Sequence, residues 1–313
     1  MIAAFCRLLH VRNIALLLAL LGPLPVPAAA PDAEVEALQL PAWLIRDGKR
    51  MPLALGTRLR NGDEINTGAG ARALLRLAEG SMVKLGENAR FTVNGMTQKR
   101  LGPGREQCCD GPEGAGLFTA TLSVLEGAFR FTTTGLYKFR GQRDVQVRFT
   151  TATAGIRGTD LWGKSTAERD IVALIEGKIT VTRGTDKPIV MDQPRTVYQA
   201  PAGLPSLPID AITAEQLGLY AAETEIAQGQ GALGKGGRWR VYAAQAATQA
   251  EALAVYDRLQ EAGYPATISP ITTQGKTVYR VRIAGLLSEA DGTAVAVKLK
   301  VELDLSDVTV SLN

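Results

Sequence analysis

The segments Trp239-Arg-Val-Tyr-Ala243 and Thr277-Val-Tyr-Arg-Val-Arg-Ile283 decide the fold of the C-terminal part of this chain. In both, apolar side chains alternate with polar or aromatic ones, as in a strand with one face on a core. Between them, Thr248-Gln-Ala-Glu251 is a capping box, and apolar residues at helical spacing follow it as far as Gly263. The other predicted elements are a strand over Pro265–Ile271, a capped helix from Ser288 and a strand over Val308–Leu312. The order is βαββαβ, which predicts an α+β, ferredoxin/RNP-like module over residues 238–313 with its helices on one sheet face.

The same alternation predicts which side chains lie on the free face of that sheet. Aliphatic positions of the two quoted strands should face the helices, and the positions between them should be free. An aromatic ring on such a face can cover the apolar side of a sugar, and guanidinium groups can donate forked hydrogen bonds to its oxygens. An ordinary solvated sheet face would have a similar composition, so the residues alone leave both interpretations open. The candidate binding residues are four from the strands and one in the adjoining turn: Arg240, Tyr242, Arg280, Arg282 and Gln245.

An RNA-binding sheet shares this topology and is the main competitor. It would carry aromatic residues on its central strands in a Lys/Arg-Gly-Phe/Tyr pattern, and that pattern is absent. Residues 238–313 also contain 8 basic and 8 acidic side chains, so the module is neutral. We therefore expect no nucleic-acid partner.

Residues 41–200 have a different character. Short β-type runs alternate with glycine-containing turns such as Glu79-Gly80, Glu126-Gly127 and Glu176-Gly177, and no run has a convincing helical period. This predicts a mainly β module, either a sandwich, a roll or a solenoid. The region contains 24 basic and 16 acidic residues, a net charge of +8 that could face an anionic envelope polymer or could simply be solvated.

The two modules are separated by residues 201–237. Thr213-Ala-Glu-Gln216 can cap a helix that runs to about Gln228. The glycine-dense segment over residues 228–237 then predicts a flexible linker. The expected organisation is a signal segment over 1–30, a β module over 41–200, a helix with a linker over 201–237 and the α+β module over 238–313.

The first thirty residues have the order of a secretory signal. Arg7 and Arg12 precede the apolar run Ile14–Leu21, and the small residues Ala28-Ala29-Ala30 follow. The run is too short to span a membrane. We expect cleavage near Ala30 and an exported, periplasmic protein, soluble or wall-associated, without a transmembrane segment after cleavage.

Export removes the one histidine of the chain, His10, with the signal. This excludes Ser-His-Asp and Cys-His hydrolases and the common histidine-bearing zinc sites, although a glycosidase with paired carboxylates remains open. No metal cluster or phosphate loop is recognisable, so no cofactor is expected. The adjacent Cys108 and Cys109 could form a strained vicinal disulfide or remain two thiols.

Residues 238–313 resemble the sporulation-related repeat, or SPOR domain. The resemblance is carried by the topology and by Trp239–Ala246 and Tyr279–Leu286 with their Tyr-Arg-Val core. Ala244-Gln-Ala246 and Ala284-Gly-Leu286 replace the Gly-Ser-Phe and Gly-Pro-Phe turns of the family. The resemblance implies binding to peptidoglycan glycan strands stripped of their peptides, through the free-face residues named above.

Residues of about 50–185 resemble the FecR domain. The most specific part is Ile156-Arg-Gly-Thr159, followed by a strand and a Glu-Gly-Lys turn. The resemblance implies a β-rich periplasmic scaffold with an unspecified partner. The other matching segments are Ala71–Gly86, Leu122–Phe131 and Ile175–Val181.

Together these features predict a non-enzymatic protein of a Gram-negative cell envelope. Its SPOR-like module would bind denuded glycan strands, and its FecR-like module would contact an unknown envelope protein. The main alternative is a sensor that acts in a sigma/anti-sigma pathway through a partner chain. A carboxylate-dependent glycosidase is the third hypothesis.

Overall fold

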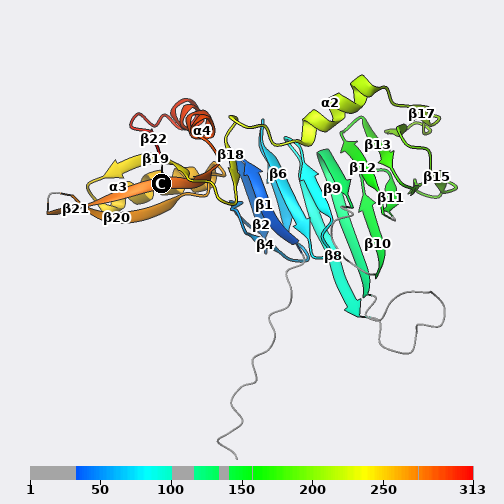
Figure 1. Ribbon diagram of the computed structural model, residues 1–313, viewed down its shortest axis with the longest axis horizontal. Coiled ribbons are helices and arrows are strands. Elements are labelled where there is room, and N and C mark those ends of the chain that lie inside the picture. The colour runs from blue at the N-terminus through cyan, green and yellow to red at the C-terminus, as the bar shows by residue number, and fades with distance from the viewer. Residues whose placement is uncertain (1–32, 101–115, 134–140, 157, 274, 313) are drawn as a thin grey trace, which may run out of the picture. The chain divides into compact units, whose positions relative to one another are not determined.

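The computed structural model describes residues 33–100, 116–133, 141–156, 158–273 and 275–312 (Figure 1). The predicted signal segment and the pair Cys108 and Cys109 lie outside these residues. The described part is mainly β and contains three helices, in agreement with the predicted fold class.

Two sheets that share one long strand make up the N-terminal region (Figure 1). The strands of the first sheet, in spatial order, are β4 (Arg58–Leu59), β1 (Ala33–Gln39), β6 (Arg72–Leu77), β7 (Met82–Leu85), β9 (Gly116–Thr132), β12 (Asp160–Ser165), β13 (Arg169–Glu176), β16 (Thr196–Pro201) and β17 (Asp210–Ala211). Those of the second are β3 (Lys49–Pro52), β2 (Ala42–Arg46), β5 (Glu64–Thr67), β8 (Arg90–Arg100), β9, β10 (Gly141–Arg148), β11 (Thr153–Ile156), β14 (Ile179–Thr182) and β15 (Ile189–Met191).

Strand β9 passes from one sheet to the other at Gly127. Its first part pairs antiparallel with β8 and parallel with β10, and its last six residues pair with β7 and β12. Gly127 has a φ of +82°, and a Cβ atom there would lie 2.5 Å from the Cα atom of Ala89. Only glycine fits such a position. The turn predicted at Glu126-Gly127 is therefore wrong: this is a crossing point inside a continuous strand, whereas Glu176-Gly177 does connect β13 to β14.

Alternating burial along the strands builds the core. Strand β6 alternates half-buried and buried residues throughout its length, as expected for one face on a core. The fully buried side chains of Phe91, Phe118, Phe129 and Phe131 belong to the same apolar cluster as those of both sheets.

Helix α2 (Ala214–Thr224) packs on the first sheet through a stacked pair of rings. The predicted capping box of Thr213 and Gln216 is present, and the helix ends at Thr224, before the expected Gln228. The ring centroids of Trp162 on β12 and Tyr220 on the helix are 4.1 Å apart.

The glycine-rich segment is not the flexible linker that its composition predicts. It forms strand β18 (Ala232–Gly234), which pairs with β1 on one side and with β21 (Lys276–Leu286) on the other. The carboxylate of Asp291 accepts hydrogen bonds from the backbone N–H groups of Gly229, Gly231 and Ala232 at 2.7, 3.1 and 2.9 Å. These bonds fix the segment, which composition alone could not show. The limits of the domains remain a prediction.

The C-terminal module has the predicted βαββαβ order. Its sheet runs β20-β21-β19-β22, and both helices cover the face that carries Val241, Val281 and Ile283, all fully buried. Gly292, which weakens the start of the second helix, has a packing reason: a Cβ there would lie 2.5 Å from Cγ1 of Val310. The elements are β19 (Trp239–Ala246), α3 (Gln249–Glu261), β20 (Thr267–Thr273), β21 (Lys276–Leu286), α4 (Glu289–Glu302) and β22 (Thr309–Leu312).

Candidate functional site

The candidate site is the free face of the C-terminal sheet, on its two central strands. Because side chains alternate along a strand, burial of Val241 and Val281 on the helix side turns their neighbours to the opposite side. All four strand residues predicted for this face are half-buried there. In the register of β19 and β21, Tyr242 lies directly opposite Arg282, and Gln245 lies opposite Arg280.

Tyr242 lies between two guanidinium groups. The Cζ atom of Arg280 is 5.2 Å from the centroid of its ring, and that of Arg240 is 6.0 Å away. Nη1 of Arg240 also donates a hydrogen bond of 3.1 Å to the phenol oxygen. Both arginines are thus held by cation–π attraction over an aromatic surface that stays partly open.

A β-bulge brings Gln245 to this face. Strand parity would place Gln245, three positions after Tyr242, on the helix side. The register of β19 shifts between Tyr242 and Ala244, and this extra residue restores the outward direction. Nε of Arg280 then donates a hydrogen bond of 2.9 Å to Oε1 of Gln245. Gln245 therefore belongs to the strand and not to the adjoining turn, where the sequence placed it.

Two guanidinium donors of this face have no partner. Within the part of the chain that the structure describes, the Nε atoms of Arg240 and Arg282 are buried and make no hydrogen bond. A buried donor without a partner is costly unless something satisfies it. The same guanidinium groups carry further N–H donors on their Nη atoms, and both side chains are only half-buried, so a ligand that lies over Tyr242 can accept hydrogen bonds from those.

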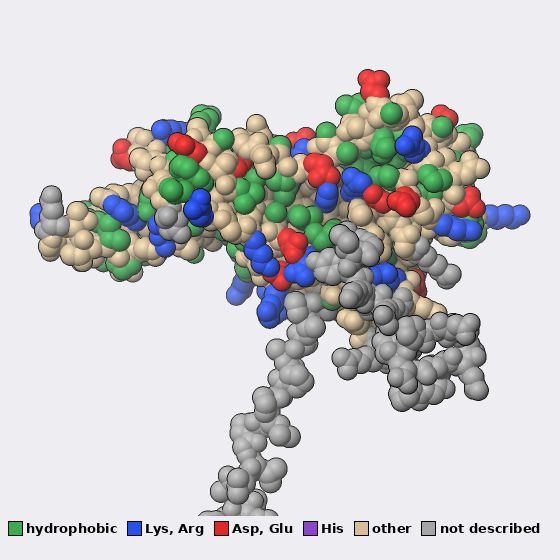
Figure 2. Space-filling view, viewed as in Figure 1, with side chains coloured by type: hydrophobic (Ala, Val, Ile, Leu, Met, Phe, Trp, Pro, Cys, Tyr) green, Lys and Arg blue, Asp and Glu red, His purple; other side chains and the backbone are tan. Residues whose placement is uncertain are grey.

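The arginines beside Tyr242 lower the pKa of its phenol. Burial alone would raise the pKa of its phenol, but the hydrogen bond from Arg240 and the charges of Arg240 and Arg280 outweigh it and lower that pKa. Figure 2 shows basic and acidic side chains on the visible surface, and residues 238–313 together are neutral. The positive charge is therefore local to the arginines.

The outer strands contribute small hydroxyl groups that the sequence reasoning missed. Residues directly opposite in adjacent strands point to the same face. Ser269 lies opposite Arg280, and Ser311 lies opposite Arg240. The same argument adds Thr267, opposite Arg282, and Thr309, opposite Tyr242. The strand register is the signal that identifies them, and it could not be read from the sequence alone.

The described residues offer no candidate for a metal site or for a membrane-spanning helix. They contain no cluster of three or more His, Cys, Asp or Glu side chains arranged to hold a metal ion. No helix among them is long and apolar enough to cross a membrane.

Comparison with known proteins bears mainly on the C-terminal module. No curated protein matches the chain. Two crystal structures of a candidate anti-sigma factor from Parabacteroides distasonis ATCC 8503 are similar at 14% identity and a TM-score of 0.37. The match covers 76% of this chain and 92% and 91% of the two matched chains. Residues 235–310 match the SPOR family model, so this part of the chain is a SPOR domain, a non-catalytic module that binds peptidoglycan.

Proposed function

We propose that this chain is a periplasmic, non-enzymatic protein of the cell envelope that holds glycan strands of peptidoglycan on the free face of its SPOR domain. The observation that carries the proposal is the half-buried ring of Tyr242 with the guanidinium groups of Arg240 and Arg280 beside it, at 6.0 and 5.2 Å from its centroid. A glycan strand offers both an apolar sugar face for the ring and amide or carboxyl oxygens for the donors.

The arrangement suits a strand that has lost its stem peptides. Tyr242 would cover one sugar ring, and Arg240 and Arg282 would donate to oxygens on either side of it. Gln245 already accepts from Arg280, so its amide N–H₂ is available to donate to a carbonyl oxygen. A sugar carrying a peptide would have to place that bulk against the sheet, so we expect the face to prefer denuded strands.

The FecR-like β module, residues 41–200, is proposed as the part that contacts another envelope component. Its net charge of +8 suits an acidic partner surface. The neutral SPOR domain would then keep the protein at the wall while the basic module binds elsewhere.

The test is co-sedimentation of the chain from Pro31 with purified sacculi, before and after an amidase removes the stem peptides. Replacing Tyr242 and Arg280 together with Ala should lower the affinity at least about tenfold, because aromatic and arginine contacts usually dominate such interfaces. Lys300→Ala, a charge-removing change at an exposed position of α4, is the matched control and should bind like the parent. If the double variant bound as well as the parent, the free face of the SPOR sheet would not be the glycan-binding surface.

A further inference from the structure

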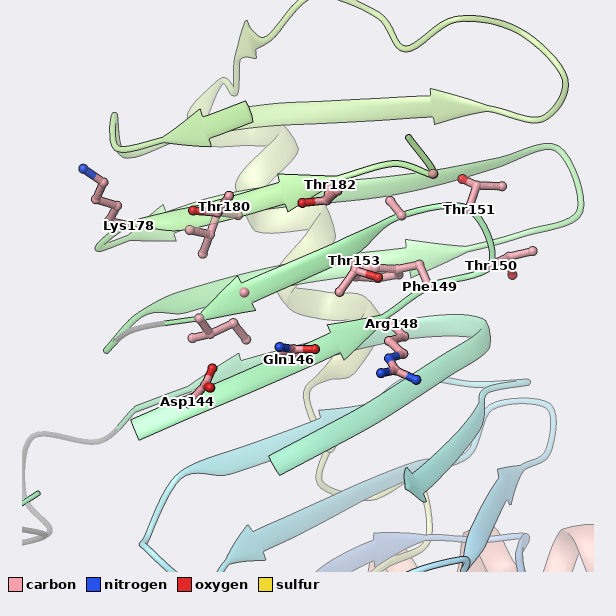
Figure 3. Close-up of a pocket in the computed structure, with 15 residues that line it drawn as sticks. Asp144, Gln146, Arg148, Phe149, Thr150, Thr151, Thr153, Lys178, Thr180 and Thr182 are labelled. Atoms are coloured by element: carbon pink, nitrogen blue, oxygen red, sulfur yellow. The ribbon is translucent and has the colours of Figure 1, made fainter. Parts of the chain in front are cut away.

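A groove of about 1020 Å³ lies on the outward face of the second sheet, along β11 (Figure 3). Val147, Ala154 and Val181 of its three central strands are buried in the core, so the alternate residues face outward. Strands β10 and β14 supply the walls, and β11, whose outward residues are smaller, supplies the floor. The residues used below are Gln146 and Arg148 on one wall, Thr180 and Thr182 on the other, and Thr153 and Gly155 on the floor.

The floor is hollow because of a glycine that the fold does not require. The backbone of Gly155 is outside the left-handed region, and a Cβ atom there would meet only the carbonyl oxygen of Thr180, at an ordinary 3.8 Å. Glycine inside a strand weakens it and often marks a place where a ligand approaches closely. Gly95, on the same cross-strand row through Thr121 and Gln146, also has nothing within 4 Å of its would-be Cβ. Gly95 adjoins a β-bulge of β8, where glycine is common, so Gly155 is the glycine that marks the open floor of the groove.

The strands that line this groove offer no free edge to a ligand, because β10, β11 and β14 are interior strands paired on both sides. Recognition by strand addition is therefore excluded, and side chains must do it. Threonine hydroxyls both donate and accept, as does the amide of Gln146, which matches a ligand rich in hydroxyl and amide groups. Among the described residues, the lining carries two cations, Arg148 and Lys178, against one carboxylate, Asp144, so the charge of these residues nearly balances.

We propose that this groove binds an extended, nearly neutral polysaccharide strand. The floor strand, Thr153–Ile156, is about 13 Å long at the usual rise of a strand, which is longer than a single sugar ring. The choice of a polysaccharide rests on the proposed function, because a wall-binding protein meets that polymer at high local concentration. The groove would add a second contact, independent of the SPOR face.

The test is calorimetric titration of the chain from Pro31 with a β-1,4-linked N-acetylglucosamine hexamer. Gly155→Gln fills the floor without backbone strain, and Gly155→Ala is its matched control because a Cβ fits. Thr182→Val, which removes one hydroxyl at equal shape, keeps the test valid where the larger side chain disturbs folding. Each variant is made in the parent and in the Tyr242→Ala, Arg280→Ala background, and circular dichroism checks the fold.

In the double-variant background, Gly155→Gln should weaken the remaining affinity about tenfold and Thr182→Val about threefold, with Gly155→Ala close to its parent. If Gly155→Gln and Gly155→Ala had equal affinity in both backgrounds, the proposed groove site would be wrong, and the proposed binding to the SPOR face would be unaffected. If Gly155→Gln abolished binding and the double variant Tyr242→Ala, Arg280→Ala did not, the groove would be supported and the SPOR-face proposal would be wrong. A dissociation constant that rises steeply with salt would show that the groove takes a polyanion, and would also overturn the proposal.

Discussion

Substitution of Asp291 tests how the glycine-rich segment is held. The side chain is fully buried at the start of α4, and it accepts the three backbone hydrogen bonds from Gly229, Gly231 and Ala232 and one of 2.5 Å from the hydroxyl of Ser288. Hydrogen bonds to a charged acceptor are stronger than neutral ones. This one carboxylate therefore fixes strand β18, which pairs with both β1 and β21.

The expected loss of stability follows from the backbone N–H groups that lose their hydrogen-bond acceptor. Asp291→Ala leaves three backbone N–H groups without an acceptor, at about 1 to 3 kcal/mol for each one that water does not reach. Gly229 is half-buried and can be solvated, so we expect a total loss of about 3 to 5 kcal/mol in the free energy of unfolding. Asp291→Asn keeps an oxygen acceptor and should lose about 1 to 2 kcal/mol. The exposed Asp307→Ala is the matched control and should change little.

The assay is urea unfolding of the chain from Pro31, with amide hydrogen exchange at residues 229–232. Burial would raise the pKa of Asp291, but the hydrogen bonds from Ser288 and the three backbone N–H groups lower it below its ordinary value. A lowered folded pKa means that the stabilisation is complete above the unfolded value of about 3.9 and is lost as the pH falls through the folded pKa. The difference between parent and Asp291→Asn should therefore shrink in that acid range. A loss below about 0.5 kcal/mol for Asp291→Ala, with unchanged exchange, would refute this account.

Three further predictions concern the β9 crossing and the SPOR sheet. Gly127→Ala should destabilise the chain by more than about 2 kcal/mol in thermal unfolding, because the added Cβ atom would collide with Ala89 at a residue that has a positive φ. Gly95→Ala is the control, because a Cβ atom at Gly95 meets open space. Equal stability of the two variants would contradict the assignment of Gly127 as the point where β9 crosses between the sheets. Val281→Asp should unfold the SPOR domain, because it buries an unpaired charge, whereas Val278→Asp, at a half-buried position, should be tolerated better. A well-dispersed amide NMR spectrum of Val281→Asp would contradict the placement of Val281 on the helix-covered face of the sheet. Arg280→Ala should raise the pKa of Tyr242, because it removes one of the positive charges that lower this pKa. The pKa is measured by ultraviolet titration, as the difference between the protein with Tyr242 and its Tyr242→Phe variant. An unchanged pKa would show that Arg280 does not act on the phenol.

The fold of the SPOR domain could be predicted from sequence because its elements are defined by local patterns. The capping box at Thr248 and the alternation around Val241 and Val281 each act within a few residues. The N-terminal sheets depend instead on pairings between distant segments. Nothing local shows that β9 pairs parallel with β10 or that β18 pairs with β1, so only the class could be predicted there.

The site shows the same division. Arg240, Tyr242, Arg280 and Arg282 follow from strand parity alone, and the structure places all four on the predicted face. Gln245 reaches it only through the bulge, for which the sequence gives no signal. The unpartnered Nε donors also depend on how tightly neighbouring side chains pack, which no pattern of residue types specifies.

The two candidate surfaces differ in what each can contribute to binding one polymer. The SPOR face offers an aromatic ring and half-buried guanidinium groups, so a ligand there gains both apolar cover and charged donors. The groove on the β module offers hydroxyls and an amide that water satisfies in the free protein, and its aromatic residue, Phe149, is buried. Exchange of water for sugar hydroxyls at such a surface gains little net free energy for each bond. We therefore expect the SPOR face to supply most of the affinity and the groove to add a weaker second contact. Occupying both with one chain raises the effective concentration at the second surface, which makes a weak groove useful only beside a stronger anchor.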